Sequence, residues 1–467
     1  MENWQAFFKD KTVTVMGLGL LGRGIADTKF LAKYAKNVIV TDLKSDEALR
    51  SALDELKEFS NIKYVLGEHH DEDFIQTDLV LKNAAVPPSS KYLKIAREHN
   101  IPIEMDESLF AKFKPEDAKI IGVTGTRGKT TTTFLINDLL PLTGKPFHLA
   151  GNVQGKATLP LLEIVQPGDL ILLELSSWQL QGFGEAQISP EIAIWTNLYP
   201  DHLNYYQGSM EAYANDKKNI YLYQKPPSMS SRGDRRENPG SLKLDYSSDI
   251  YIYNQDDDFV RNTSHEAKAQ KISFSINDVP EDWQFKILGK HNRSNVAAAL
   301  ACGHALGLSD EAMRPVLENF GGVEYRLQYL GEKNNLKFYN DSTSTTPVAG
   351  ATALAAFPNQ DIYLIAGGSD KNLEFDDWAA MAKDNAKAIF LLKGEGTNKI
   401  KDALLKIGAE NLVSGEYESL VGAWEALLAQ AGYGIVLFSP ACASFGMFIN
   451  EYDRGEQFSK LVKEYLK

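Results

Sequence analysis

The sequence predicts an α/β protein of three domains, each built around a largely parallel sheet. Short apolar runs alternate with segments of helical periodicity along almost the whole chain, which is the pattern of strands joined by crossover helices. The chain has 467 residues, which at about 150 residues per domain corresponds to roughly three domains. Hydrophobic residues make up 43% of it and charged residues 24%, so three ordinary cores can be buried.

The predicted strands fall into three groups along the chain. Helices are expected over 20–35 in the first group and over 291–307 in the second. The stretch 225–248 is rich in Pro, Ser and Gly and is expected to be an exposed loop. The domains are expected at 1–106, 107–322 and 323–467. The strands are expected at 12–16, 37–42, 78–82, 118–125, 169–175, 191–196, 361–366, 388–393 and 434–439.

Charge and composition exclude several classes of protein. Forty-nine Lys and Arg stand against 62 Asp and Glu, a net charge of −13 that argues against binding to nucleic acid or anionic membranes. Cys302 and Cys442 are too few for a disulfide framework or a four-cysteine zinc site. No apolar run approaches the roughly 18 residues of a membrane span, and the N-terminal segment lacks the features of a signal peptide. We therefore expect a cytoplasmic protein without membrane insertion.

A first glycine-rich turn, Gly17-Leu18-Gly19-Leu20-Leu21-Gly22, lies between a predicted strand and a predicted helix. Asp42 ends the next strand, which completes the spacing of a dinucleotide-binding fingerprint. The helix N-terminus would bind a diphosphate, but it responds to charge, so any nucleotide diphosphate fits as well as NAD. A purely structural turn is the alternative.

A second turn, Gly125-Thr126-Arg127-Gly128-Lys129-Thr130, follows a predicted buried strand and precedes a helix. Its backbone N–H groups would surround phosphates, Lys129 would reach the β- and γ-phosphates, and Thr130 would bind Mg²⁺. The strict pattern has a glycine five positions before Gly128, where this chain has Val123. We therefore expect an ATP-binding loop in which fewer residues than usual separate the first glycine from Gly128-Lys129-Thr130.

Three ionisable residues are expected near the second turn. Glu174 ends an apolar strand, where a Mg²⁺ ligand would lie, although a buried acid paired with an arginine is the alternative. His202 follows a later strand, and a single histidine is more often structural. In a helix expected over 211–223, the apolar positions place Lys217 on or beside the inward face. An inward lysine is avoided unless it is paired or functional.

Taken together, these segments resemble the Mur ligases, the ATP-dependent enzymes that add amino acids in peptidoglycan synthesis. The resemblance covers nearly the whole chain, including GLGLLG, TGTRGKTTTT, LELSSWQL, TNLYPDHLNYY, GKHNRSN, NDSTSTTP, AGGSDK and SPACASFGMF. It implies a Rossmann-like first domain, a P-loop ATPase-type central domain and a Rossmann-like third domain. It also implies a monomeric ligase that adds D-glutamate to UDP-N-acetylmuramoyl-L-alanine through an acyl phosphate, with domain closure.

The resemblance implies a role for each matching residue. The catalytic residues would be Lys129, Glu174, His202 and Lys217, with a CO₂ adduct (a carbamate) on Lys217. Two Mg²⁺ ions would be held by Thr130, Glu174, His202 and Lys217. ATP would contact Gly125, Thr126, Arg127, Gly128, Lys129, Thr130, Thr131, Asn292, Asn295, Arg326 and Asp341. The UDP-substrate would contact Gly19, Leu20, Leu21, Asp42, Asn83, Asn152, Ser176 and Gln179. The amino acid would contact Thr345, Lys371 and Ser444.

Three positions depart from the family's usual pattern. Thr343 stands where a lysine near the incoming glutamate is usual, Gly446 where an acid is usual, and Asn83 where a serine is usual. The reaction class is unaffected, but D-glutamate, L-glutamate and other acidic amino acids stay open as substrates.

Other classes of protein fit the sequence less well. A diaminopimelate-adding sister ligase would carry a DNPR-like motif, and a folylpolyglutamate synthetase would lack the first glycine turn. An NAD-dependent dehydrogenase leaves the second turn and the third domain unexplained. A non-ligating Mur-like subunit of an amidating complex tends to carry a four-cysteine metal ribbon, which two cysteines cannot build.

Overall fold

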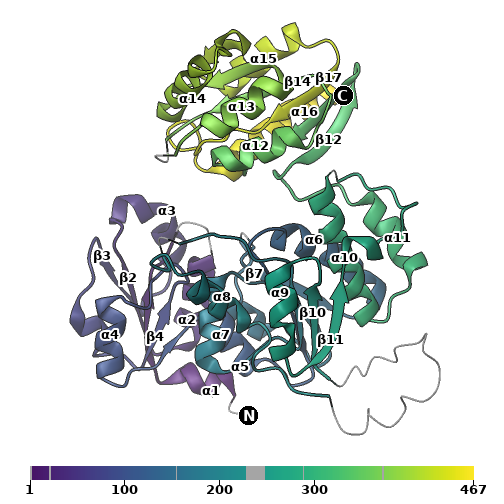
Figure 1. Cartoon of the computed structure of the whole chain (residues 1–467). Coiled ribbons are helices and arrows are strands. Elements are labelled where there is room, and N and C mark those ends of the chain that lie inside the picture. The colour runs from purple at the N-terminus through teal and green to yellow at the C-terminus, as the bar shows by residue number, and fades with distance from the viewer. Residues whose placement is uncertain are drawn as a thin grey trace, which may run out of the picture. The chain divides into compact units, whose positions relative to one another are not determined.

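The computed structural model describes residues 3–19, 23–153, 155–203, 205–227, 248–287, 289–370 and 373–467. The chain divides into two compact units (Figure 1). Unit 1 consists of Met1–Trp283 with His291–Leu317, and unit 2 of Gln284–Lys290 with Glu318–Lys467. Each of the three sheets lies within one of the expected domains, and the expected domain boundaries themselves stay a prediction. Residues 228–247 of the expected loop lie outside the described residues.

The first sheet of unit 1 is parallel and has the strand order β3-β2-β1-β4-β5. The order reverses direction on either side of β1, so the loops after β1 and β4 diverge and leave a place for a ligand. The first glycine turn follows β1, and Asn83 follows β4. The elements are α1 (Trp4–Lys9), β1 (Thr12–Met16), α2 (Arg23–Tyr34), β2 (Asn37–Asp42), α3 (Asp46–Leu56), β3 (Ile62–Leu66), η1 (Asp71–Phe74), β4 (Leu79–Lys82), α4 (Lys91–Glu98), β5 (Ile103–Glu104) and α5 (Asp106–Phe113).

The second sheet of unit 1 is also parallel, in the order β11-β10-β9-β6-β8-β7. Strand β6 lies between β8 and β9, so the segments that follow these three strands meet at one edge of the sheet. The elements are β6 (Lys119–Thr124), α6 (Lys129–Leu139), η2 (Leu140–Thr143), β7 (Phe147–Gly151), η3 (Leu159–Glu163), β8 (Leu170–Glu174), α7 (Ser177–Ala186), β9 (Ile192–Trp195), α8 (Met210–Lys218), β10 (Ile250–Asn254), α9 (Asp258–Thr263), η5 (Ser264–Glu266), β11 (Gln270–Phe274), η6 (Ile276–Asp278), α10 (Lys290–Ala305) and α11 (Asp310–Asn319).

The helix expected over 211–223 is shorter in the structure, because α8 ends at Lys218. The side chain of Ser189 explains the end of the helix. Its hydroxyl donates to the carbonyl of Asn219 (2.7 Å) and accepts from the backbone N–H of Tyr223 (3.1 Å). These bonds satisfy backbone groups that a longer helix would have paired internally.

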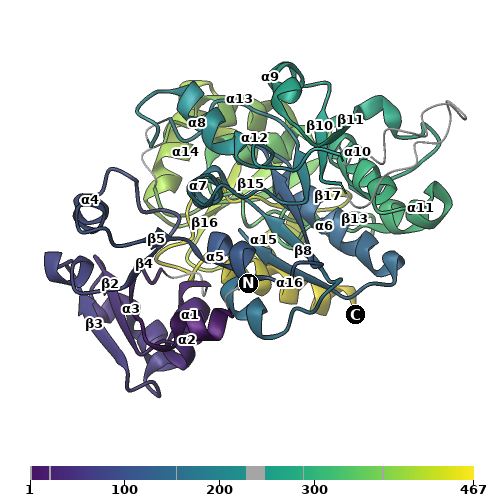
Figure 2. The ribbon, with the colours of Figure 1, turned by 90° about the horizontal axis from the view of Figure 1, so that it is seen from below.

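Unit 2 contains one sheet, in the order β12-β13-β17-β14-β15-β16, in which β12 is antiparallel to β13 and the other pairs are parallel. Alternate residues of β14 enter two separate cores: Ile362 and Leu364 pack with α12, α13 and α14, whereas Tyr363 and Ile365 pack with α15 and α16. Figure 2 shows these two groups of helices on opposite sides of β15–β17. The elements are β12 (Gln328–Lys333), β13 (Leu336–Asn340), α12 (Pro347–Ala355), β14 (Ile362–Gly367), α13 (Asp376–Asn385), β15 (Ala386–Leu392), α14 (Glu395–Lys406), η7 (Glu410–Leu412), β16 (Val413–Tyr417), α15 (Leu420–Gln430), β17 (Gly434–Phe438) and α16 (Glu451–Leu466).

None of the helices within the described ranges combines the length and apolar character needed to cross a membrane.

Candidate active site

The turn between β6 and α6 has a backbone that requires its two glycines. Gly125 has φ +153° and Gly128 has φ +78°, where L-residues are strained. A Cβ at Gly125 would lie 1.9 Å from Thr196 Oγ1, and one at Gly128 would lie 2.2 Å from Asn295 Oδ1. Asn295 in turn donates from Nδ2 to Asn292 Oδ1 (3.0 Å). The structure therefore brings both predicted asparagines of α10 against the predicted ATP-binding turn.

Lys129 begins α6 and its amine lies over this turn. Its Nζ donates to the carbonyl of Gly125 at 3.0 Å and to that of Thr126 at 3.1 Å. Thr130 and Thr131 are half-buried in the same helical turn, whereas Arg127 is exposed and its backbone N–H donates to Asn197 Oδ1 (2.8 Å). A lysine and the start of a helix are thus placed together, which suits a phosphate.

Lys217 is buried beside Lys129, with 1% of its surface exposed. Its Nζ donates to the carbonyl of Gly125 (2.8 Å), an acceptor that it shares with Lys129, and lies 3.4 Å from Thr124 Oγ1. Burial, followed by the positive charge of Lys129, holds the pKa of Lys217 well below its usual range. A lowered pKa favours the neutral amine, the form of a lysine that acts as a nucleophile.

Glu174 ends β8 with a carboxylate that is only partly satisfied. Its Oε1 accepts from Asn152 Nδ2 (2.9 Å), while Oε2 is buried and has no hydrogen-bond partner among the described residues. Among the described residues, the hydrogen-bond partner of Glu174 is Asn152, and no arginine pairs with it. A free buried carboxylate oxygen suits a cation.

His202 follows β9 and packs against the indole of Trp178 in a tilted arrangement, with ring centroids 4.8 Å apart. Burial lowers the pKa of His202, which favours the neutral imidazole that binds metals. The described residues contain no group of three His, Cys, Asp or Glu side chains placed to hold a metal ion. Glu174 and His202 fit Mg²⁺ only when further oxygen ligands join them. A protonated Lys217 cannot act as such a ligand.

One cavity of about 360 Å³ is lined by residues from the regions of both sheets of unit 1. Its described lining includes the basic residues Arg23, Lys129 and Lys217, and no Asp or Glu. Such a lining in a chain with a net charge of −13 indicates an anionic ligand. The described lining residues are Leu18, Gly19, Arg23, Gly24, Asn83, Ala84, Ala85, Lys129, Asn152, Ser176, Ser177, Trp178, His202, Tyr213 and Lys217.

Asp42 holds the first glycine turn rather than lining the cavity. Its Oδ2 accepts from the backbone N–H groups of Leu18 (2.9 Å) and Gly19 (3.3 Å). These two N–H groups are therefore committed within the protein. The predicted residues Leu20 and Leu21 lie outside the described part of the chain.

Ser176 and Gln179 form a capping box at the start of α7. Ser176 lines the cavity, whereas Gln179 is fully buried and donates from Nε2 to Glu107 Oε1. Gln179 therefore supports the wall of the cavity from behind.

In unit 2, the predicted residue Asp341 is buried at the end of β13. Its Oδ1 accepts from the N–H of Leu327 (3.0 Å) and its Oδ2 from the hydroxyl of Ser439 (2.7 Å). Burial raises the pKa of Asp341 to about 6, and the charge of the exposed Arg326 opposes this rise. Ser444 is buried, and its Oγ has no hydrogen-bond partner among the described residues, whereas Thr345 is half-buried. Lys371 lies outside them.

Arg454 of α16 is an organising residue of unit 2 that the sequence analysis missed. It is fully buried, donates to the hydroxyl and carbonyl of Ser342 (3.0 and 2.7 Å), and donates to the carbonyl of Cys442 (3.2 Å). It therefore ties together the two segments that carry Asp341 and Ser444.

We expect Asp341→Asn to stabilise the protein at high pH. The folded pKa of Asp341, about 6, lies above the ordinary 3.8, so its contribution to stability is present at low pH and is lost as pH rises through 6. The variant should gain about 1.4 kcal/mol relative to wild type between pH 5 and pH 8, because about half of the total of about 3 kcal/mol has already been lost at pH 5, above the ordinary pKa. Urea unfolding at both pH values measures this gain, with Asp402→Asn on the exposed face of α14 as control. An equal difference at both pH values would contradict the buried carboxylate's role.

The fold and the cavity define an α/β protein with two glycine turns and a cavity lined by basic residues. A family profile described as the Mur ligase middle domain matches residues 123–303. The chain is 38% identical to the UDP-N-acetylmuramoylalanine–D-glutamate ligase of Roseiflexus sp. (strain RS-1), over 97% of this chain and 99% of that one. It is 35% identical to the ligase of the same name from Borreliella afzelii (strain PKo), over 97% of this chain and 98% of that one. The chain belongs to the Mur ligase family.

Solved structures agree on the fold. The UDP-N-acetylmuramate–alanine ligase MurC of Thermotoga maritima aligns with a TM-score of 0.58 at 19% identity, covering 97% of this chain and all of that one. The MurF ligase of the same organism, solved with ADP, aligns with a TM-score of 0.56 at 16% identity, covering 99% and 97%. The expected α/β fold of a Mur ligase is confirmed.

Proposed function

We propose that this chain is an ATP-dependent ligase that joins D-glutamate to UDP-N-acetylmuramoyl-L-alanine and yields ADP and phosphate in peptidoglycan precursor synthesis. The observation that carries the proposal is the cavity of about 360 Å³, in which the first-sheet residues Gly19 and Asn83 and the second-sheet residues Lys129, His202 and Lys217 line one space. A nucleotide-sugar held by the first sheet would thus reach the phosphate-binding turn of the second. We further propose that the enzyme is a cytoplasmic monomer.

The proposed chemistry begins with phosphoryl transfer. The L-alanyl carboxylate attacks the γ-phosphorus of ATP, ADP leaves, and an acyl phosphate forms. Lys129 would neutralise charge on the transferring phosphoryl oxygens. The amine of the amino acid then attacks the acyl carbon, loses a proton and expels phosphate, which forms the amide bond.

Two Mg²⁺ ions would supply further charge neutralisation and alignment of the phosphates. Thr130, Glu174 and His202 would hold them, and Glu174 Oε2 is the buried oxygen without a partner in the described structure. Lys217 would join this set after its neutral amine adds CO₂ and releases a proton, because the resulting carbamate is an anionic oxygen ligand. Its burial and lowered pKa support this modification.

The identity of the amino acid has a second candidate. Thr343, which stands where a lysine is usual, donates its hydroxyl to the carbonyl of Tyr325 (2.9 Å). Because threonine is neutral, Thr343 offers no positive charge to an acidic side chain. L-Glutamate or another acidic amino acid is therefore the alternative to D-glutamate as the substrate.

Phosphate release tests the proposal. The enzyme is supplied with ATP, Mg²⁺ and UDP-N-acetylmuramoyl-L-alanine, and separately with D-Glu, L-Glu, D-Asp and meso-diaminopimelate. Turnover with D-Glu alone is expected. Turnover with L-Glu alone would replace the amino acid within the same chemistry, and no turnover with any of the four would reject the proposed reaction.

Lys371→Ala is expected to raise the KM for the amino acid far more than the KM for ATP. The proposed role of Lys371 is to pair with the side-chain carboxylate of the amino acid, and losing a charged hydrogen bond lowers affinity by roughly 10- to 100-fold. Steady-state kinetics with each substrate varied in turn measure the two constants. Lys393→Ala, which removes an exposed ion pair with Glu418, serves as control. Equal effects on both constants would rule out this anchoring role.

A further inference from the structure

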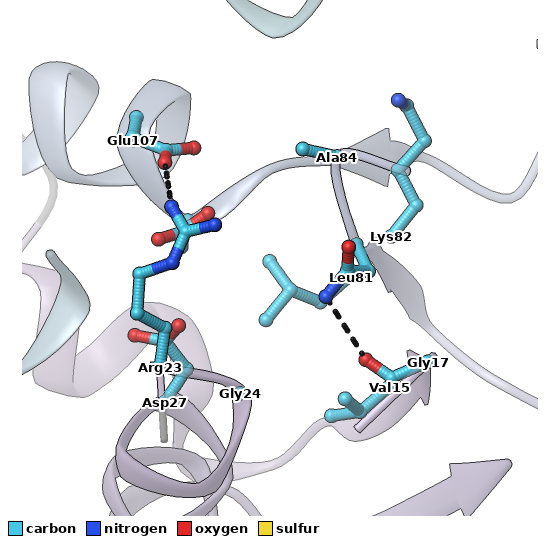
Figure 3. Close-up of a pocket in the computed structure, with 11 residues that line it drawn as sticks. Val15, Gly17, Arg23, Gly24, Asp27, Leu81, Lys82, Ala84 and Glu107 are labelled. Carbon is cyan, nitrogen blue, oxygen red and sulfur yellow. Dashed lines mark hydrogen bonds and ion pairs between the residues drawn. The ribbon is translucent and has the colours of Figure 1, made fainter. Parts of the chain in front are cut away.

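Arg23 is a cation of the cavity to which the proposed chemistry gives no role. It is the first described residue after the glycine turn and begins α2. Its Nη1 donates to the carbonyl of Gly151 (3.0 Å) and lies 3.7 Å from Glu107 Oε1 (Figure 3). Its side chain remains 21% exposed and lines the large cavity. The guanidinium has five N–H donors in a rigid fork, so donors remain for a ligand.

Three acidic residues lie on the side of Arg23 that faces away from the large cavity. Asp27, Asp106 and Glu107 line a separate cavity of about 30 Å³, which Arg23 also lines. Glu107 has 1% of its surface exposed, and its Oε2 has no hydrogen-bond partner in the described ranges. Lys82 lines this small cavity too, but its side chain points away from Arg23 and Glu107 (Figure 3). Glu107 therefore contacts Arg23, at 3.7 Å, whereas its effect on Lys82 is only a longer-range electrostatic one.

Two of these acids, Glu107 and Asp27, do not fully cancel the charge of Arg23. Burial and the neighbouring Asp106 raise the pKa of Glu107 well above its usual value, and burial and Asp106 do the same for Asp27. Raised values favour neutral carboxyl groups. Arg23 therefore keeps positive charge for the large cavity, where no described Asp or Glu lies in the lining.

The position of Arg23 indicates which anion it binds. Lys129 of α6 and Lys217 of α8 lie beside the second sheet, and both donate to the carbonyl of Gly125. Arg23 begins α2, which packs on the first sheet. It lines the cavity together with Gly19 and Asn83, which follow β1 and β4 where the strand order reverses. The N–H groups of Leu18 and Gly19, which would otherwise bind a diphosphate, are committed to Asp42. Among the described groups at this place, the guanidinium of Arg23 is then the donor whose fork matches phosphate oxygens.

We infer that Arg23 binds the diphosphate of the nucleotide-sugar substrate and that Glu107 positions the guanidinium of Arg23 for it. This inference rests on the proposed function for the identity of the substrate. Glu107 also accepts from Gln179, which caps α7 with Ser176, so one buried carboxylate fixes two parts of the cavity wall.

Calorimetric titrations with UDP, uridine and pyrophosphate test the role of Arg23. Arg23→Met should weaken UDP and pyrophosphate binding by about 10- to 100-fold and leave uridine and ADP–Mg²⁺ binding unchanged. Lys29→Met on the same helix, which removes a surface ion pair with Glu55, should change none of them. Unchanged UDP affinity in Arg23→Met would overturn the inference, and so would a wild type that binds neither UDP nor pyrophosphate.

Two further variants separate binding from folding. Arg23→Met leaves Glu107 without the side chain that it contacts, so Arg23→Met/Glu107→Gln replaces both partners and should show the same loss of UDP affinity in a protein of near wild-type thermal stability. Glu107→Gln alone should raise the KM for the nucleotide-sugar several-fold with kcat and the KM for ATP unchanged. Parallel changes in all three constants would make Glu107 merely structural. A wild type that binds UDP through Arg23 but releases no phosphate with any amino acid would reject the proposed function alone.

Discussion

Lys217→Ala should lower turnover by about a thousandfold. The proposed carbamate of Lys217 supplies an oxygen ligand for Mg²⁺, and such ligands account for several kcal/mol of transition-state stabilisation, where each 1.36 kcal/mol is about tenfold. The alanine leaves a space beside the carbonyl of Gly125 that acetate or formate can enter. Phosphate release with and without these short carboxylates should therefore show partial rescue.

Lys218→Ala is the matched control for this prediction. Lys218 is the next residue of α8, but it pairs with Glu266 at 2.8 Å instead of facing the phosphate-binding turn. Its loss should leave turnover near that of wild type and unaffected by acetate. Wild-type activity in Lys217→Ala would show that Lys217 carries no essential carbamate, and so would a large loss of activity that no carboxylate reverses.

Lys129→Met should lower kcat by roughly a hundredfold to a thousandfold, the usual cost of removing one preorganised group that stabilises transition-state charge. The methionine keeps the length of the side chain but cannot neutralise a phosphoryl oxygen. Single-turnover measurements of ATP cleavage detect the loss at the chemical step. Lys145→Met, an exposed lysine ahead of β7, is the control. If cleavage kept its rate while only ATP affinity fell, Lys129 would bind the ground state rather than the transition state.

Most interior strands were predicted from sequence, whereas the edge strands and the interior strands β10 and β13 were not. Strands such as β8, β14 and β17 are buried on both faces and contain continuous apolar runs. The edge strands β3, β11 and β16 are mostly exposed or half-buried, and their sequences IKYVL, QKISF and VSGEY contain at most three apolar residues in a row. Their strand conformation depends on pairing with a neighbour that is distant in sequence.

The residues of the candidate site likewise divide into those that a local sequence pattern predicts and those that no local pattern predicts. Lys129, Glu174 and Lys217 follow from local patterns, namely a glycine turn, the end of an apolar strand and the face of a helix. The capping box of Ser176 and Gln179 was also readable as a pattern of serine followed by glutamine. Arg23 and Arg454 carry no such pattern, because their partners Gly151 and Ser342 lie 128 and 112 residues away in the chain. Only the folded chain shows what these arginines contact.

Arg454 also bears on the order in which this protein acquires its structure during translation. The ribosome completes the segments around Ser342 and Cys442 before it adds α16, so their shared hydrogen-bond donor arrives after both have been made. A nascent chain halted before α16 would have β17 and its neighbours but no cation between the two segments. Helix α16 also carries Phe458 and Val462 of the core on one face of this sheet, so the stalled product would lack both the cation and part of its core and would be a target for proteolysis.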